Sequence, residues 1–380
     1  MASQPLRVLA IEPYYGGSHR RFLDDVIANS RHDWTLIHGK PIHWKWRMRS
    51  APLELAQLAR QRLVTMPSPD LVFCTDMLDL PQWQGLLRDP RILLLPTVIY
   101  FHENQWTYPV SSQARTDAHY GYTNLLSAIA ADVCWFNSQY HKNDFLTASE
   151  AFVRRMPDAA SAHDFATLKA KCEVVAPGFS PPLDRELFPT VPPKAAAPAD
   201  RHALRIGWVS RWEHDKRPDR FARLLELLSK HAVDFDLVLL GARTETPGRS
   251  KPDESLQRIR RDYRRQIIHD GYATSRQEYW RQLSQLDVVI STADHEFFGI
   301  GICEAIWAGA VPILPDRLSY PELAIEECLY DSLPDAALRI KSLTATHRRQ
   351  ELSARCRDRL ERYRTEHVVE VIDKSFDRLA

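Results

Sequence analysis

The feature that most restricts the fold of this 380-residue chain is an alternation of apolar strands and helices that occurs twice. In the first half, apolar runs at 6–13, 91–103 and 133–138 alternate with segments of helical spacing. These runs are continuously apolar, which is typical of parallel strands with helices over both faces. The alternation starts again with strands at 204–210 and 234–242. The sequence therefore predicts an α/β protein with two doubly wound, Rossmann-like domains.

A proline-rich stretch separates the two halves. Residues 189–203, PTVPPKAAAPADRHA, contain four prolines and no periodicity, as is typical of a linker. We expect an N-terminal domain over 1–188 and a C-terminal domain over 204–365, with a last helix over 366–380 that could cross back to the N-terminal domain. Open parallel sheets bind ligands at the carboxyl ends of their strands, so the two domains would face each other across a cleft.

Composition narrows the class of protein. The formal net charge is +1, so nucleic acid could be bound only through a local basic patch. No apolar run reaches the ~18 residues of a membrane-spanning helix, and the N-terminus does not resemble a secretory signal. The six cysteines are scattered, without the spacing of a zinc site. We expect a cytoplasmic protein with no membrane partner and no structural metal.

Two cations follow the first strand of the C-terminal domain. Arg211 and Lys216 stand in SRWEHDKRP, residues 210–218, at the strand end where such sheets bind ligands. A guanidinium and an ammonium in one loop suit a diphosphate, which offers several anionic oxygens. The alternative is a solvated basic turn in which the two cations pair with Glu213 and Asp215.

Two glutamates lie in an almost uncharged segment, HEFFGIGICEAIWAGAVP, at 295–312. Gly299 and Gly301 permit a close approach of the backbone and precede a predicted helix, whose N-terminus could hold phosphate oxygens. We expect Glu304 about one turn into that helix and Glu296 in the loop before it. Carboxylates accept hydroxyl donors well, so one could hold a ribose diol and the other a sugar. The helix dipole alone would account for Glu304 but not for Glu296.

The N-terminal domain offers polar groups at two predicted strand ends. EPYYGGSHRRF, residues 12–22, is a strand–helix junction in which Gly16 and Gly17 could let backbone amides approach a ligand. A pair of glycines after a strand also suits any tight turn. The apolar strand over 91–103 leads into four polar residues, His102, Glu103, Asn104 and Gln105.

One short segment mixes aromatic and basic side chains. HWKWRMRS, residues 43–50, has a composition suited to stacking on unpaired bases and pairing with phosphates, or to a half-buried amphipathic segment. A second basic stretch, RIRRDYRRQ at 258–266, falls in a predicted helix over 252–268 and has five arginines. It could equally be an exposed helix face balanced by nearby acids.

Together these stretches resemble a known family. R-x4-K followed by E-x7-E resembles the donor site of retaining, family-4-like glycosyltransferases of the GT-B fold. EPYYGGSH, HWKWRMRS, YFHENQWTYPV, RWEHDK and HEFFGIGICEA resemble the tRNA-queuosine mannosyltransferase family more closely, and they extend from residue 12 to residue 305. The resemblance implies a retaining hexosyltransferase with GDP-mannose as donor. The implied acceptor is the queuosine base in the anticodon loop of a tRNA.

The resemblance also implies roles for individual residues. Glu304 would bind the donor ribose and Glu296 the transferred sugar, while His102 would touch that sugar on its reacting face. Arg211 and Lys216 would neutralise the leaving diphosphate, so that neither a metal nor another cofactor is expected. The other implied donor contacts are Gly16, Gly17, Phe297, Phe298 and Gly299. The implied acceptor contacts are His19, Trp44, Lys45, Trp46, Arg47, Arg49, Glu103, Asn104 and Gln105.

Two other functions stay open from the sequence. One is a GT-B hexosyltransferase that uses another nucleotide sugar, or a lipid or glycan acceptor. The other is a non-catalytic protein that binds a nucleotide or a tRNA. The presence of both R-x4-K and E-x7-E speaks against the second, because a site without turnover does not need both.

Overall fold

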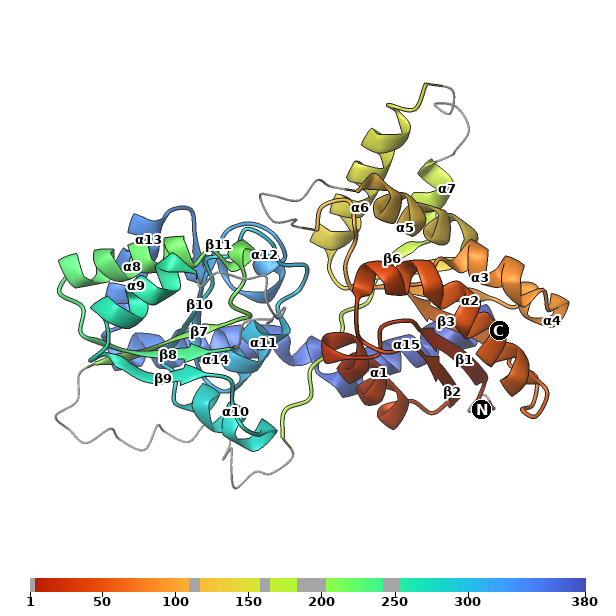
Figure 1. The fold of residues 1–380 in the computed structure, drawn as a ribbon. Helices are drawn as coiled ribbons and strands as arrows, with labels where there is room; N and C mark the ends of the chain where they lie inside the picture. The colour runs from red at the N-terminus through yellow and green to blue at the C-terminus, as the bar shows by residue number, and fades with distance from the viewer. Residues whose placement is uncertain (1–3, 109–116, 158–164, 183–202, 242–252) are drawn as a thin grey trace. The chain divides into compact units, whose positions relative to one another are not determined.

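The computed structural model describes residues 4–108, 117–157, 165–182, 203–241 and 253–380. The chain forms two compact units, Met1–Gly178 with Tyr363–Ala380, and Phe179–Arg362 (Figure 1). The predicted linker over 189–203 lies outside the described residues except for its last position. The helix expected over 366–380 is α15, Thr365–Leu379, and it belongs to the first unit.

The first unit is built on a six-stranded parallel sheet in the order β2-β1-β3-β4-β5-β6. Its strands are β1 Arg7–Glu12, β2 Asp33–His38, β3 Leu71–Thr75, β4 Thr97–Phe101, β5 Val133–Phe136 and β6 Cys172–Val174. The central strands β3 and β4 are buried along their whole length. Because both faces of such a strand need cover, helices pack above and below the sheet.

The two faces of this sheet have different helices. On one face, α1 Gly17–Asn29 lies beside α15, whose Phe376 packs on Trp34, Phe73 and Trp135 (Figure 1). The core of the other face contains apolar side chains from α2 Trp44–Leu63, α3 Leu80–Leu87, α5 Ala118–Ala130 and α6 Gln139–Val153. Two short helices, α4 Pro90–Leu93 and α7 Phe165–Ala170, complete the described helices of the unit.

The single strand expected over 91–103 is wrong. Pro90 begins α4, because its fixed backbone angle suits the first turn and Asp89 caps the helix by accepting a hydrogen bond from the Arg91 amide at 3.0 Å. The strand β4 starts only at Thr97, after Pro96. Apolar content alone did not distinguish a short helix from a strand.

The second unit has its own six-stranded parallel sheet, in the order β12-β11-β10-β7-β8-β9. The strands are β7 Leu204–Val209, β8 Phe235–Leu240, β9 Ile267–Gly271, β10 Val288–Ile290, β11 Val311–Pro315 and β12 Leu329–Tyr330. The α-helices are α8 Pro218–Lys230, α9 Glu254–Asp262, α10 Arg276–Ser284, α11 Ile300–Trp307, α12 Tyr320–Leu323, α13 Leu333–Ser342 and α14 Thr346–Leu360. The helix expected over 252–268 ends early, at Asp262, because the chain turns there into β9.

Each sheet has one point where the strand order reverses. This point lies between β1 and β3 in the first sheet and between β7 and β10 in the second. The loops that leave two such strands diverge to opposite faces, and doubly wound proteins bind ligands in the crevice between them. Among the described residues, no helix is both long and apolar enough to cross a membrane.

Candidate active site

The reversal point of the second sheet holds a buried lysine. Lys216 ends a short 3₁₀ turn, His214–Lys216, which follows β7. Its Nζ lies 3.0 Å from Asp215 Oδ2 and 3.3 Å from Glu296 Oε2, and it donates to the His295 carbonyl oxygen at 2.8 Å. Burial lowers the pKa of Lys216, but the charges of Glu296 and Asp215 outweigh that effect and raise it above its usual value. A charged ammonium is therefore held at the expected ligand edge.

Arg211, the other predicted cation, is in a different environment. Its guanidinium lies 3.7 Å from Glu213 Oε1, and 57% of its side chain is exposed. The alternative of a solvated, paired turn therefore describes Arg211 but not the buried Lys216. Lys216 and Glu296 are in contact across the reversal point. The sequence had predicted only that both lie at the same edge of the sheet.

The two predicted glutamates have separate partners. Glu304 lies one turn into α11 and is buried, whereas Glu296 lies in the preceding loop with a quarter of its side chain exposed. The Glu304 carboxylate pairs with Arg276 and accepts a hydrogen bond from the Tyr279 hydroxyl at 2.7 Å. An unpaired buried carboxylate would be costly, and these contacts offset that cost.

Sequence reasoning missed Arg276 and Tyr279. Both lie in the first two turns of α10, after Ser275, which caps this helix by accepting from the Glu278 amide. The Arg276 guanidinium also lies over the Tyr279 ring, 4.9 Å from its centroid. The one sequence hint was an arginine at the start of α10, the third described α-helix of the second unit.

The loop between the two glutamates is fixed by its backbone. Gly299 has a φ of 101°, which favours glycine, and α11 begins immediately after it. The Ser319 hydroxyl donates to the carbonyl oxygens of Glu296 and Phe298, at 3.2 and 3.0 Å. The side chains of Phe297 and Phe298 are buried, so these residues would offer a ligand mainly their backbone.

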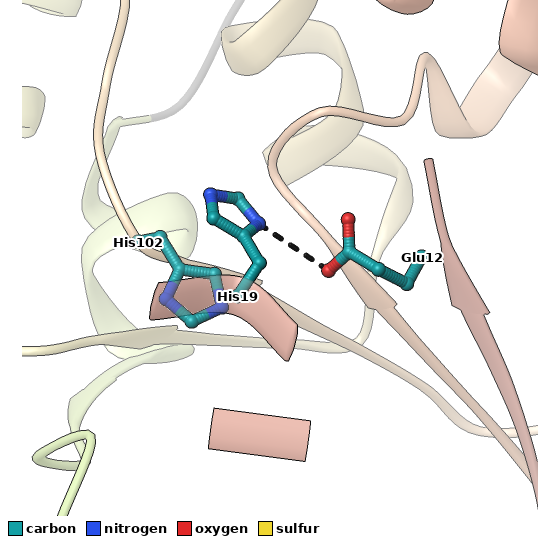
Figure 2. A group of neighbouring side chains, drawn as sticks. All are labelled: Glu12, His19 and His102. Carbon is teal, nitrogen blue, oxygen red and sulfur yellow. Dashed lines mark hydrogen bonds and ion pairs between the residues drawn. The ribbon is translucent and has the colours of Figure 1, made fainter. Parts of the chain in front are cut away.

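In the first unit, three titratable side chains meet at the ends of β1 and β4. Glu12 is the last residue of β1, His19 lies in the first turn of α1, and His102 directly follows β4. Figure 2 shows the Glu12 carboxylate turned toward His19, with Oε2 3.3 Å from Nδ1. The His19 and His102 rings stack with their centroids 4.0 Å apart and a tilt of 36°.

The two stacked histidines have opposite pKa shifts. Burial lowers the pKa of His19, but the charge and hydrogen bond of Glu12 outweigh it and raise the pKa to about 9. For His102, loss of solvation and then the charge of His19 lower the pKa well below its usual value. At neutral pH His19 is therefore protonated and His102 is neutral. His19, one of the predicted acceptor contacts, is only 7% exposed and lies against these partners.

The Glu12–His19–His102 cluster fits a metal ion poorly. Its three potential ligand atoms lie within 4.8 Å of one another. A tetrahedral zinc site needs nitrogen lone pairs that converge on one point ~2.0–2.1 Å away. The two rings instead lie against each other with a tilt of 36°, and Glu12 already holds the charged His19. That the protein works without metal stays a prediction.

The predicted glycines of the first unit have structural reasons for being glycine. A Cβ at Gly16 would lie 2.3 Å from Pro41 Cβ, so only glycine fits beside that proline. Gly17 has a φ of 54° and is the first residue of α1. These constraints explain both glycines, and their contact with a donor stays a prediction.

The polar residues after His102 mainly hold their own loop. The Asn104 side chain is buried, donates to Asp144 at 3.1 Å and accepts from the Trp106 amide at 3.1 Å. The buried Gln105 side chain donates to Glu103 Oε1 at 2.9 Å. Glu103 is only half-buried and is the most accessible of the three. A direct contact of these residues with an acceptor stays a prediction.

The segment HWKWRMRS forms the start of α2 and gains an aromatic partner from α5. The Trp44 and Tyr120 rings are 5.3 Å apart, Lys45 lies over Trp44, and Arg49 lies over Tyr120. Trp46 is 74% exposed. We call Trp44, Lys45, Trp46, Arg49 and Tyr120 the aromatic–basic patch. Tyr120 is too distant in sequence to have been predicted.

Arg47 does not share this exposed surface. It pairs with Glu54 on α2, and only 11% of its side chain is exposed. The second basic stretch is likewise neutralised, since Arg258, Arg260 and Arg261 pair with acidic neighbours. All nine residues of that stretch are described, and its three arginines in α9 match the alternative of an exposed face balanced by acids.

Two such sheets, with polar sites at their reversal points, are the architecture of GT-B glycosyltransferases. The structure of Anabaena Alr3699/HepE in complex with UDP and glucose is similar, with a TM-score of 0.66 and 16% identity over 98% of this chain and 100% of that one. The OtsA apo structure matches with a TM-score of 0.65 and 14% identity, over 99% and 100% of the two chains. The predicted GT-B fold class is confirmed.

Sequence relatives define the family more closely. A family model described as tRNA-queuosine alpha-mannosyltransferase N-terminal matches residues 7–179, and one described as family 4 glycosyltransferase in conflict systems matches residues 159–320. The tRNA-queuosine alpha-mannosyltransferase of Drosophila melanogaster is 34% identical over 331 residues, which are 86% of this chain and 83% of that protein. The chain belongs to the tRNA-queuosine alpha-mannosyltransferase family, as its motifs had indicated.

Proposed function

We propose that this protein transfers a mannosyl group from GDP-mannose to the queuosine base of a tRNA, with retention of configuration. The observation that carries the proposal is the Lys216–Glu296 pair, with its buried lysine, at the reversal point of the second sheet in a chain that belongs to this family. The Drosophila melanogaster relative bears the name of this activity. The reaction takes place in the cytoplasm and uses no metal or other cofactor.

The second unit supplies the donor site. As the bond from the sugar to the diphosphate breaks, the Lys216 ammonium neutralises the charge that develops on the leaving group. The partly exposed Glu296 accepts hydroxyl donors of the transferred sugar. Glu304 already holds Arg276 and Tyr279, but each carboxylate oxygen has two lone pairs, so a ribose hydroxyl can be added.

Retention follows from attack on the same face that the diphosphate leaves. The acceptor hydroxyl oxygen forms the new bond to the sugar carbon, and its proton passes to an oxygen of the departing diphosphate. His102 faces the sugar during this step. Lys216 is protonated throughout because its pKa is raised, so it stabilises charge and does not act as a base.

The aromatic–basic patch of the first unit supplies an RNA-binding surface. Unpaired bases of a loop stack on exposed rings such as Trp46, and basic side chains such as Lys45 and Arg49 pair with phosphates. Protein–RNA recognition of this kind prefers single-stranded loops, whose bases can be splayed outward. The patch therefore fits an anticodon loop better than a duplex.

Nucleoside mass spectrometry of tRNA tests the proposal. Queuosine-containing tRNA is incubated with the protein and GDP-mannose, then digested, and we expect queuosine to gain one hexose. Parallel incubations use UDP-glucose, GDP-glucose and tRNA that lacks queuosine, and the Lys216→Ala variant is the inactive control. Hydrolysis of a nucleotide sugar without transfer to any tRNA would instead favour a lipid or glycan acceptor.

A further inference from the structure

His102 is held firmly by its backbone, while one ring nitrogen has no hydrogen-bond partner among the residues that the structure describes. The His102 amide donates to Asp76 Oδ1 at 2.9 Å, and its carbonyl oxygen accepts from Asn137 Nδ2 at 2.8 Å. The residue as a whole is half-buried, but its Nε2 is buried and makes no hydrogen bond within the described part of the chain. Leaving a buried polar group unpaired costs roughly 1–3 kcal/mol, so this nitrogen is poised for a polar group from outside the chain.

The His19 ring, which lies against His102, is also fixed. Glu12 is fully buried, and its Oε1 accepts from the Tyr14 amide at 2.6 Å, which leaves Oε2 directed at His19. His19 in turn lies against His102, with the two rings tilted by 36° (Figure 2). The Phe22 and Tyr100 rings also contact His102, with centroids 5.1 and 4.7 Å from its own. Glu12, His19 and His102 are each placed by an element of secondary structure or by its end, so the three side chains form one cluster.

We propose that Glu12 and His19 are a positioning pair that helps to hold the His102 imidazole uncharged where it meets the donor sugar. That the partner is the donor sugar rests on the proposed function, whereas the charge state of His102 does not. Neither Glu12 nor His19 touches the substrate in this assignment. Both act through the stacked ring.

The charges around His102 indicate what the positioning pair contributes. Several groups surround His102: Asp76 after β3, Glu103 beside it, Glu12 at the end of β1, and His141 on α6. Loss of solvation is the largest effect that lowers the pKa of His102, and the charges of His19 and His141 act in the same direction. The positive charge of His19 opposes a proton on His102 at close range, and Glu12 keeps His19 charged because it raises the pKa of His19 to about 9.

An uncharged His102 suits glycosyl transfer in two ways. Neutral imidazole offers one donor and one acceptor nitrogen, whereas imidazolium can only donate. The transition state of glycosyl transfer also resembles an oxocarbenium ion, so a cation facing the reacting carbon would raise the barrier. The arrangement places the positive charge on His19, where Glu12 compensates it, and not on the ring that faces the sugar.

The charge of His102 can be measured directly in the full-length protein. Histidine ring resonances are followed by NMR from pH 4.5 to 9.5 in the wild type, in His19→Asn and in Glu12→Gln. Asparagine at 19 can still donate to Glu12 but carries no charge. We expect the pKa of His102 to rise by about 1–3 units in His19→Asn, from a charge interaction of a few kcal/mol at ~4 Å. His231→Asn, at the end of α8 in the other unit, should leave it unchanged.

Activity gives the second readout. In His19→Asn, the acidic limb of the pH profile of kcat should move toward neutral pH. The shift should equal the change in the His102 pKa that NMR gives. At a pH well above the His102 pKa of both the wild type and the variant, kcat of His19→Asn should return to within about threefold of wild type. A merely structural defect would not allow this recovery. If His19→Asn does not fold, Glu12→Gln provides the same comparison, because glutamine can keep the acceptor for the Tyr14 amide and removes the charge.

The outcomes separate the two proposals. A His102 resonance that titrates identically in wild type and both variants overturns the positioning pair, whether or not mannose is transferred. A shifted resonance without any transfer to queuosine leaves the pair intact and overturns the proposed function. Zn²⁺ is added as a third arm. Stoichiometric binding that perturbs His19 and His102 together, and that Glu12→Gln abolishes, would make the cluster a metal site and also overturn the proposal.

Discussion

The Glu12–His19 pair should make the stability of the first unit fall as pH rises. His19 holds its proton more tightly in the folded state, with a pKa of about 9 against 6.5 for the unperturbed side chain. The stabilisation is therefore fully present below pH 6.5 and is lost as the pH rises through 9. At about 1.36 kcal/mol per pKa unit, this shift corresponds to a loss of about 3 kcal/mol in the free energy of unfolding. That is a large fraction of a typical domain stability of ~5–15 kcal/mol.

Native-state hydrogen exchange can isolate this effect to one unit. The exchange of β1 and α1 amides, corrected for the intrinsic rate at each pH, gives the opening free energy of the region that contains the pair. It is measured at pH 6 and pH 10 in the wild type and in Glu12→Gln. In the variant, burial still lowers the pKa of His19 and only the charges of Asp76 and Glu103 oppose it, so most of the loss of stability between the two pH values should disappear.

Comparing the two proteins removes contributions from groups that titrate in both. The wild type should lose up to about 3 kcal/mol more than Glu12→Gln over this interval. Equal losses would mean that Glu12 does not hold a proton on His19, and the electrostatic reasoning for the cluster would fail. Amides of β7, in the second unit, serve as an internal control and should show no difference between the proteins.

Three further predictions concern the donor and acceptor sites. Lys216→Ala should lower turnover by about 10²–10³-fold in a transfer assay, and Arg211→Ala by less, because its guanidinium is largely solvated. Retention of wild-type turnover by Lys216→Ala would remove the diphosphate role. Glu304→Gln should weaken GDP binding in calorimetry, whereas Glu296→Gln should spare GDP binding and impair transfer; equal losses of affinity would contradict that division. Trp46→Ala should weaken tRNA binding by about 1–3 kcal/mol while nucleotide-sugar hydrolysis continues, and unchanged tRNA affinity would place the acceptor surface elsewhere.

The parts of the site that could be predicted from sequence are those at strand ends. Parallel strands bring their carboxyl ends to one edge, so a motif after an apolar run can be placed without knowing how helices pack. Lys216 after β7, Glu296 after β10 and His102 after β4 all follow this rule. Their helical neighbours could not be placed in the same way, because helix rotation and tilt depend on the whole core.

The contacts that escaped prediction all involve a side chain whose direction depends on how its helix is rotated. Tyr279 reaches Glu304 from α10, Tyr120 reaches Trp44 from α5, and His19 stacks on His102 from α1. Each pair is distant in sequence and needs a particular helix rotation. The same limit explains the wrong strand over 91–103, where local capping by Asp89 prevailed over apolar content.

The position of α15 in the first unit has a consequence for synthesis on the ribosome. The first unit is interrupted by the whole of Phe179–Arg362, and its last helix is translated only after that insertion. At about 5–20 residues per second the gap lasts on the order of ten seconds or more. During this time Trp34, Phe73 and Trp135 lack the Phe376 ring that packs on them in the finished protein. The nascent chain thus presents an aromatic surface of the kind that chaperones recognise, and it does so until the final helix emerges.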